Sequence, residues 1–297
     1  MLLLILTSRL RPLVRADLDD FVSQGTRKWY ASHGIPYKRS LLLFGSPGAG
    51  KTSLIQALAG RYKRNLAILT PSHPEMTDDG LKAAVQRVPS KSIIVLEDVD
   101  AIFAEGRSKK DGDKSSLTFS GVLNALDGVG ASTGQIFILT TNHREKLDPA
   151  LIRNGRVDCH VEFTDADAEQ AAQLFRQFYS EAEDKVALSE AFAKRLFELI
   201  EKRKTSISMA ALQHYFIIMR RATAKEAAEG VAKILEEAEA HGKLQKEREE
   251  AKKEKAEKAE EGGSQEEEDK GDGEGSETPK NSPPKDKQQM HVHVHVH

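Results

Sequence analysis

The chain has 297 residues and a mass of 32.8 kDa, which is enough for one large domain or two modest ones. Hydrophobic residues make up 39% of it, and this composition excludes a fully disordered chain, a collagen-like repeat and a polytopic membrane protein. The formal net charge of −2 offers no basic surplus, so we expect no nucleic-acid partner. Cys159 is the only cysteine, which excludes an internal disulfide and favours a reducing compartment.

The chain opens with a six-residue apolar run from Met1 to Leu6. A membrane-spanning helix needs about 20 apolar residues, and the apolar region of a signal peptide has about 7–15, so this run is too short for either. We interpret it as a buried strand or a terminal segment. The sequence therefore predicts neither a membrane span nor a targeting segment in this chain.

Short apolar runs that alternate with helical patterns predict the first domain. The pattern from Ala16 to His33 favours a helix, which Gly34-Ile35-Pro36 would end. Helical segments also follow at Leu54–Tyr62 and at Asp78–Val88, the latter with Thr77 as its N-cap. The apolar runs are typical of strands buried on both faces, and they are Leu41–Phe44, Leu66–Leu69, Ile93–Leu96, Ile136–Leu139 and, as a fifth, Val157–Phe163. We expect an α/β fold over residues 1–164, a parallel five-stranded sheet between helices with residues 1–38 as a lead-in.

After Asp165 the strand patterns stop, and a small all-helical domain is predicted over residues 165–242. Ser206 and Ser208 are both placed to cap its third helix. The four expected helices are Ala168–Tyr179, Leu188–Lys202, Ser206–Arg221 and Lys225–Ala240. Residues 243–297 form a charged, low-complexity tail that we predict to be disordered. Its terminal His–Val repeat is interpreted as solvated, with a metal site as the alternative.

The segment from Gly45 to Thr52 fits the phosphate-loop pattern GxxxxGK[S/T], directly after a predicted strand and before a predicted helix. Glycines let such a loop wrap around phosphates with its backbone N–H groups pointing inward. We expect Lys51 to contact the β- and γ-phosphates and the Thr52 hydroxyl to bind Mg²⁺. The predicted phosphate-binding residues are Gly45, Ser46, Pro47, Gly48, Ala49, Gly50, Lys51 and Thr52.

Two acids, Glu97 and Asp98, follow the third predicted strand. A phosphate-loop enzyme needs one carboxylate for Mg²⁺ and one base that orients the attacking water. Such ATPases usually have Asp before Glu, whereas the order here is reversed. We assign Glu97 to the metal and Asp98 to the base, with Asp100 as a substitute or support. The opposite assignment stays open, as does an acidic strand end without a catalytic role.

Asn142 follows the predicted strand Ile136–Leu139, separated from it by two threonines. Its side-chain amide could hold the attacking water against the γ-phosphate. A loop cap is the alternative role for this residue. Arg153 and Arg156 flank Gly155 and could act as arginine fingers that stabilise charge on a partner's γ-phosphate. An ion pair within the chain is the alternative for them.

These motifs, in this order, resemble those of the AAA ATPases, and more narrowly those of the Bcs-type mitochondrial branch. The narrower resemblance rests on Lys28-Trp29-Tyr30, on Gly34–Tyr37, on Leu96–Ala101 with its Glu-then-Asp order, on Leu117–Val129 and on Thr140–His143. It covers about residues 16–235. The branch has an N-terminal membrane anchor and a branch-specific domain that we do not find in this chain, and Asn154 stands where the branch usually has proline.

The resemblance implies a homo-oligomeric ring that binds ATP and Mg²⁺ at its subunit interfaces, with Arg153 and Arg156 offered to the neighbour. It also implies a chaperone or translocase for protein cargo, the Rieske iron–sulfur protein, in the assembly of respiratory complex III. The corresponding location is the mitochondrial inner membrane, facing the matrix. Two alternatives remain, a nucleotide-binding interaction module without turnover and an ATPase of the same branch with a different cargo.

Overall fold

The computed structural model describes residues 10–71, 73, 76–102, 117–127, 134–153, 155–236 and 294–295. The chain forms two compact units, residues 1–231 with 292–297 and residues 232–291. Of the second unit the structure describes residues 232–236, which are helical. The apolar run Met1–Leu6, Asn154 and the tail apart from residues 294–295 lie outside the described residues. Within the described part of the chain, no helix is long and apolar enough to cross a membrane.

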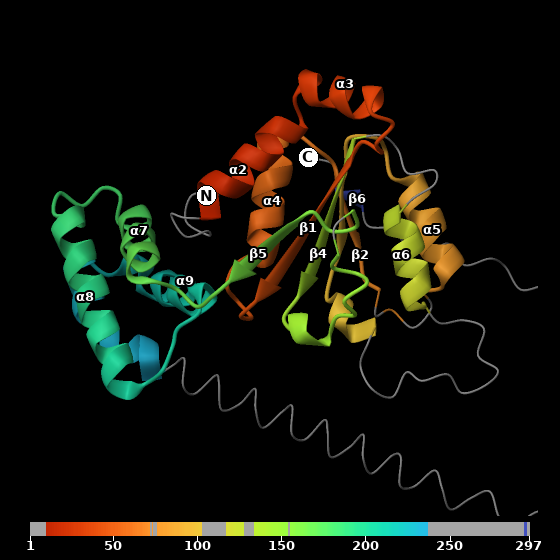
Figure 1. The fold of residues 1–297 in the computed structure, drawn as a ribbon. Coiled ribbons are helices and arrows are strands. Elements are labelled where there is room, and N and C mark those ends of the chain that lie inside the picture. Colours follow the sequence, from red (N-terminus) through yellow and green to blue (C-terminus); the bar gives the residue numbers. More distant parts are fainter. Residues whose placement is uncertain are drawn as a thin grey trace, which may run out of the picture. The chain divides into compact units, whose positions relative to one another are not determined.

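A parallel sheet forms the centre of the first domain (Figure 1), which confirms the predicted α/β class. Its parallel strands lie in the order β5-β1-β4-β3-β2. Their bounds are β1 Lys38–Gly45, β2 Leu66–Leu69, β3 Ile93–Leu96, β4 Gln135–Thr141 and β5 Cys159–Phe163. All five predicted strands are present, and β5 begins two residues later than the pattern suggested. Because the strands are parallel, their carboxyl ends lie at the same end of the sheet. The residues that follow β1, β3 and β4 therefore all emerge there.

Successive residues of the strands pack into two separate hydrophobic clusters, one on each face of the sheet. Leu42 of β1 belongs to one cluster together with residues of α5 and α6, whereas Leu41 and Leu43 belong to the other with residues of α2 and α4. Side chains of a strand point alternately to its two faces, so this division follows directly from the strand geometry. Both faces are covered by helices, which explains why the runs read as continuously apolar.

The helices of the first domain are α2 Leu10–Phe21, α3 Gln24–Ser32, α4 Lys51–Tyr62, α5 Asp78–Arg87 and α6 Phe119–Asp127, with 3₁₀ turns η1 Val99–Ile102 and η2 Arg144–Lys146. The prediction of one helix over Ala16–His33 is wrong, because the helix is interrupted after Phe21, where α2 ends, and a second helix, α3, begins at Gln24. The hydroxyl of Ser23 accepts a hydrogen bond from the Thr26 amide and caps α3. Thr77 caps α5 as predicted.

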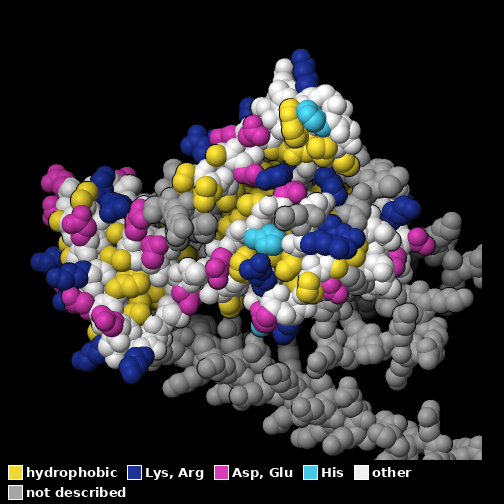
Figure 2. Space-filling model, viewed as in Figure 1, with side chains coloured by type: hydrophobic (Ala, Val, Ile, Leu, Met, Phe, Trp, Pro, Cys, Tyr) yellow, Lys and Arg dark blue, Asp and Glu magenta, His cyan; other side chains and the backbone are white. Residues whose placement is uncertain are grey.

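One side of α3 presents apolar side chains to solvent, next to a histidine (Figure 2). Trp29 is 52% exposed, and its ring stacks on that of His33 with the centroids 4.2 Å apart. Elsewhere on the face drawn in Figure 2, acidic and basic side chains are interspersed.

The helical domain consists of α7 Ala168–Phe178, α8 Lys185–Arg203, α9 Met209–Ile218 and α10 Ala224–Glu229, with the 3₁₀ turn η3 Met219–Arg221. Aromatic rings fill its core, where Phe175, Phe192 and Phe216 pack against one another. Ser208 caps α9, so that of the two predicted caps Ser208 is the one used. The fourth predicted helix is interrupted at Gly230, where α10 stops, and residues 231–236 are helical again.

A two-residue strand, β6 (Val294–His295), pairs antiparallel with β2 at the edge of the sheet. This pairing differs from the solvated repeat expected for the C-terminus. Alternation of His and Val has the period of a strand, and a sheet edge offers unpaired backbone groups to such a segment.

Candidate functional site

The phosphate loop lies between β1 and α4, and the glycine pattern matches its backbone. Gly45 has a φ of +118°, and a Cβ there would meet the carbonyl oxygen of Phe163 at 2.0 Å. Gly48 has a φ of +71° and packs against Ala210, the second residue of α9. A residue with a side chain would be strained at both positions. The Ala210 amide also donates a hydrogen bond to the Gly48 carbonyl at 3.0 Å, so α9 touches the loop directly.

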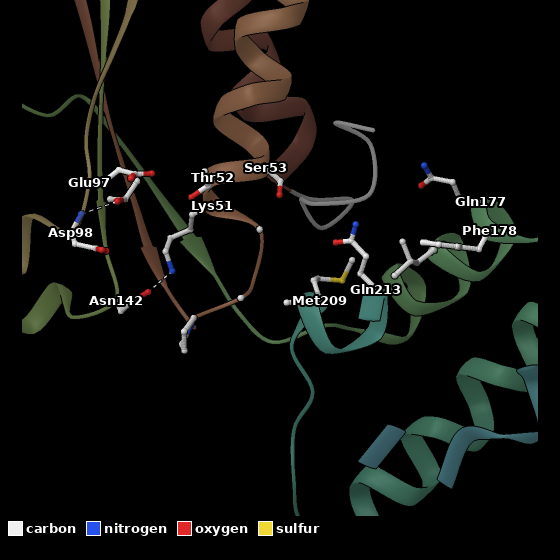
Figure 3. A pocket seen from close by; sticks show the side chains of 16 residues that line it. Lys51, Thr52, Ser53, Glu97, Asp98, Asn142, Gln177, Phe178, Met209 and Gln213 are labelled. Carbon is white, nitrogen blue, oxygen red and sulfur yellow. Dashed lines mark hydrogen bonds between the residues drawn. The ribbon is translucent and has the colours of Figure 1, made fainter. Parts of the chain in front are cut away.

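Lys51, the first residue of α4, donates three hydrogen bonds from its ammonium group. The acceptors are the carbonyls of Gly45 and Ser46, at 2.9 and 3.0 Å, and the Asn142 carboxamide oxygen at 2.6 Å (Figure 3). Burial lowers the pKa of Lys51, opposed by the charges of Asp98 and Asp100. The structure thus brings together a lysine and an asparagine that are 91 residues apart in sequence.

The two predicted acids come directly after β3 and lie beside the phosphate loop (Figure 3). Burial raises the pKa of Glu97, and the charge of Asp98 raises it further, whereas a hydrogen bond with the Thr52 hydroxyl lowers it. Asp98 is exposed, and its φ is +49°. Few non-glycine residues adopt this conformation, and Asp is among the residue types that tolerate it best.

A cavity of about 490 Å³ joins these residues to the helical domain. One end is polar and holds Lys51, Thr52, Glu97, Asp98, Thr140 and Asn142. The other end is lined by residues of α7 and α9, which are Leu174, Gln177, Phe178, Met209, Ala210 and Gln213. One end of the cavity therefore carries a lysine ammonium group, hydroxyls and carboxylates. The other end is mainly apolar and carries the carboxamides of two glutamines (Figure 3). A nucleotide has the matching division, with an anionic phosphate chain and a flat base.

Sequence reasoning missed the apolar end of the cavity and also Thr140. The threonine could have been noticed, because it lies two residues before Asn142 at the end of the same strand. The α7 and α9 residues carry no local signal, since their role depends on how the helical domain meets the phosphate loop.

The two arginines are not among the residues that line the cavity of their own chain. Arg153 is exposed. Arg156 is partly buried, and its guanidinium donates a hydrogen bond to the Ala150 carbonyl at 2.8 Å. A single chain therefore does not bring these arginines to its own phosphate loop.

Residues 41–165 match the family described as "ATPase family associated with various cellular activities (AAA)". Residues 168–233 match "Mitochondrial chaperone BCS1-like, ATPase lid domain". The chain belongs to the AAA ATPase family, with a BCS1-like lid. The helical domain that lines the apolar end of the cavity is thus the lid domain of this family.

Three curated relatives are similar to the chain over about 70% of its length. The probable mitochondrial chaperone bcs1 of Schizosaccharomyces pombe is 40% identical over 215 residues, covering 72% of this chain and 45% of that protein. The mitochondrial chaperone BCS1 of Bos taurus is 40% identical over 210 residues, or 69% and 48%. The Homo sapiens protein of that name is 38% identical over 222 residues, or 73% and 51%. The chain spans about half the length of these relatives.

Proposed function

We propose that this protein is a Mg²⁺-dependent ATPase that converts ATP and water to ADP and phosphate. The observation that carries the proposal is the convergence of Lys51, Glu97 and Asn142 on one cavity. In this proposal the loop Gly45–Thr52 holds the phosphates through its backbone, and Lys51 contacts the β- and γ-phosphates. Asp98 accepts the proton of the attacking water, and Asn142 orients that water.

The residues present fit a magnesium ion. Glu97 and Thr52 are hydrogen-bonded to each other, and both offer oxygen atoms, the ligand type that this cation prefers. A carboxylate with a pKa raised by burial is also one that a nearby cation would stabilise in its charged form. When bound, the ion would supply positive charge that offsets the negative charge developing on the phosphate groups. We assign Thr52 and Glu97 to hold it, directly or through water.

The proposed active form is a homo-oligomeric ring in which Arg153 and Arg156 act on the nucleotide of the neighbouring subunit. Two features support this, namely the exposure of Arg153 and the absence of both arginines among the residues that line the described cavity. An arginine supplied from a partner contributes about 10³–10⁵ in rate to phosphoryl transfer. The domain division we propose is an ATPase core over residues 1–164, a lid over 165–242 and a tail over 243–297.

The cellular role proposed for the whole protein is that of a mitochondrial chaperone. It rests on the names of the curated relatives and on the match of the lid to the BCS1-like family. By the resemblance described above, the cargo is the Rieske iron–sulfur protein and the location is the inner membrane, facing the matrix. Proteins that co-purify with the chain from mitochondria would test this assignment, and a different bound protein would favour another cargo.

The enzymatic proposal is tested by measuring ATP binding and phosphate release with the same protein samples. We expect wild-type protein to bind ATP and to release phosphate only with Mg²⁺. Lys51→Met should lose ATP affinity, whereas Asp98→Asn should bind ATP but release phosphate about 10²–10⁴-fold more slowly. Lys82→Met, an exposed lysine on α5, is the matched control and should match the wild type. Tight binding of ATP by the wild type without phosphate release would instead support a nucleotide-binding module.

A further inference from the structure

Two threonine hydroxyls connect the end of β4 to the acids that follow β3. The hydroxyl oxygen of Thr140 accepts a hydrogen bond from the Asp98 amide at 3.1 Å. The hydroxyl of Thr141 donates to a carboxylate oxygen of Asp100 at 2.5 Å. Both threonines are buried, with 4% and 0% of their surface exposed. Two consecutive residues of one strand thus contact two of the three acids after the neighbouring strand.

The hydrogen bond between the Asp98 amide and Thr140 forms just after the β3 backbone leaves the sheet. The last residue of β3, Leu96, is in register with Leu139 of β4. At Asp98 the chain turns with a φ of +49°, and its amide bonds to a side chain instead of a strand carbonyl. The left-handed conformation is unfavourable for a residue with a side chain and persists only where neighbouring contacts determine it. The Thr140 hydroxyl supplies such a contact.

Thr141 connects its acid to the turn that carries Asn142. Its hydroxyl oxygen accepts a hydrogen bond from the His143 amide at 2.8 Å while the same hydroxyl donates to Asp100. The residues on both sides of Asn142 are therefore fixed, and its carboxamide oxygen lies 2.6 Å from the Lys51 ammonium. One short strand end consequently sets the positions of Asp98, Asp100 and Asn142 relative to one another.

We propose that Thr140 and Thr141 are positioning residues for the proposed ATPase reaction. Thr140 holds the Asp98 backbone in the conformation that aims its carboxylate into the cavity, and Thr141 fixes Asp100 against the Asn142 turn. The proposal rests on the function proposed above, since it needs Asp98 to act on water. Reaction rates depend steeply on such placement, and a misplacement of about 1 Å can cost about 100-fold.

The test removes each hydroxyl without changing the shape of the side chain. Thr140→Val and Thr141→Val keep a β-branched side chain that suits a strand, while Thr140→Ser and Thr141→Ser restore the hydroxyl. Ser92→Ala is the matched control, because Ser92 is fully buried at the opposite end of the sheet and its hydroxyl donates to the Pro89 carbonyl at 2.7 Å. For each variant we would measure kcat, the Kd for ATP and the melting temperature.

We expect kcat to fall about 10- to 100-fold in Thr140→Val, with the Kd for ATP within about 2-fold of wild type. Thr141→Val should show the same pattern. Both serine variants should recover most of the turnover, and Ser92→Ala should lower the melting temperature without changing kcat. Unchanged kcat in both valine variants would overturn the proposal, as would an equal loss of kcat in Ser92→Ala.

A crystal structure of Thr140→Val separates this proposal from the function on which it rests. The positioning role requires Asp98 to leave the left-handed region or its carboxylate to shift. If Asp98 keeps its φ and its place, the proposal is wrong whatever the turnover. If instead the wild type releases no phosphate, the proposed function fails, and a shift of Asp98 would still show that Thr140 positions it.

Discussion

The ammonium nitrogen of Lys51 lies 2.6 Å from the carboxamide oxygen of Asn142. This contact links the phosphate loop after β1 to the end of β4, and these two strands are neighbours in the sheet. An incoming γ-phosphate would take over part of this lysine's hydrogen bonding. Asn142 therefore has two roles in the proposed function, since it contacts the lysine and orients the water.

Changing the charge at Asn142 separates these two roles. Asn142→Asp places a carboxylate against Lys51, where it would repel the γ-phosphate, and we expect ATP affinity to fall about 10-fold or more. Asn142→Ala removes the contact without adding charge, so ATP affinity should stay near the wild-type value while kcat falls. Calorimetric titration with ATP and a phosphate-release assay would measure both. Equal affinities for the two variants would contradict this account.

The raised pKa of Glu97 predicts a stability change that depends on pH. Burial and the charge of Asp98 make this carboxyl bind its proton more tightly in the folded chain than in the unfolded chain. The ionised form therefore destabilises the fold at neutral pH, and Glu97→Gln should raise the melting temperature of the nucleotide-free protein. The difference should shrink as the pH falls through the folded pKa, because wild-type Glu97 is then protonated.

Thermal unfolding from pH 7 down to about pH 4, just below the ordinary glutamate pKa of about 4.3, would measure this difference. Glu198→Gln, at an exposed position on α8, serves as the control and should not shift the melting temperature. A lower melting temperature for Glu97→Gln at pH 7, or a gain that persists at acid pH, would contradict the prediction. Bound Mg²⁺ should reverse the order of the two melting temperatures, since only the wild type offers the ion the Glu97 carboxylate.

The two arginines should differ in their effect on stability. Arg156→Ala removes the hydrogen bond to the Ala150 carbonyl, and we expect a loss of about 1 kcal/mol in the free energy of unfolding. Arg153→Ala should leave that free energy unchanged, because the side chain is exposed. Both variants should lose phosphate release. Denaturant unfolding would compare them with Arg87→Ala, which replaces another exposed arginine and should match the wild type in both assays.

Phe178 at the apolar end of the cavity should contribute to binding and not to the chemical step. It is 38% exposed and is one of the residues that line the cavity. If the nucleotide base lies there, Phe178→Ala should raise the Kd for ATP about 10-fold through lost ring contact, with kcat unchanged. Val186→Ala, another exposed apolar residue of the helical domain outside the cavity lining, is the control. A fall in kcat at constant Kd would place the base elsewhere.

Local patterns were sufficient to predict most of the fold. The strands β2 and β3 match their apolar runs to the residue, because strands covered on both faces exclude polar side chains. The break between α2 and α3 was missed, since a single capping serine, Ser23, decides it within an otherwise helical pattern. The pairing of Val294–His295 with β2 joins segments more than 200 residues apart and has no local signal beyond the alternation itself.

In the candidate site, too, some residues could be predicted from local sequence patterns, whereas others depend on how distant segments pack. Lys51 and Thr52 follow from the loop motif, and Glu97 and Asn142 from polar residues at strand ends. The hydroxyl contacts of Thr140 and Thr141 depend on the register between β3 and β4, which no residue pattern specifies. The apolar end of the cavity depends on the contact between the Ala210 amide and the Gly48 carbonyl, and therefore on the packing of the lid domain.

The central claim, ATP hydrolysis at a site shared between neighbouring subunits, is tested most directly by mixing two inactive variants. Asp98→Asn keeps its arginines, and Arg153→Ala keeps its acids, so each supplies what the other lacks. We expect an equal mixture to recover about a quarter of wild-type phosphate release, since half of the sites keep Asp98 and half of those meet an intact Arg153. A mixture that stays as inactive as its two components would contradict the shared site.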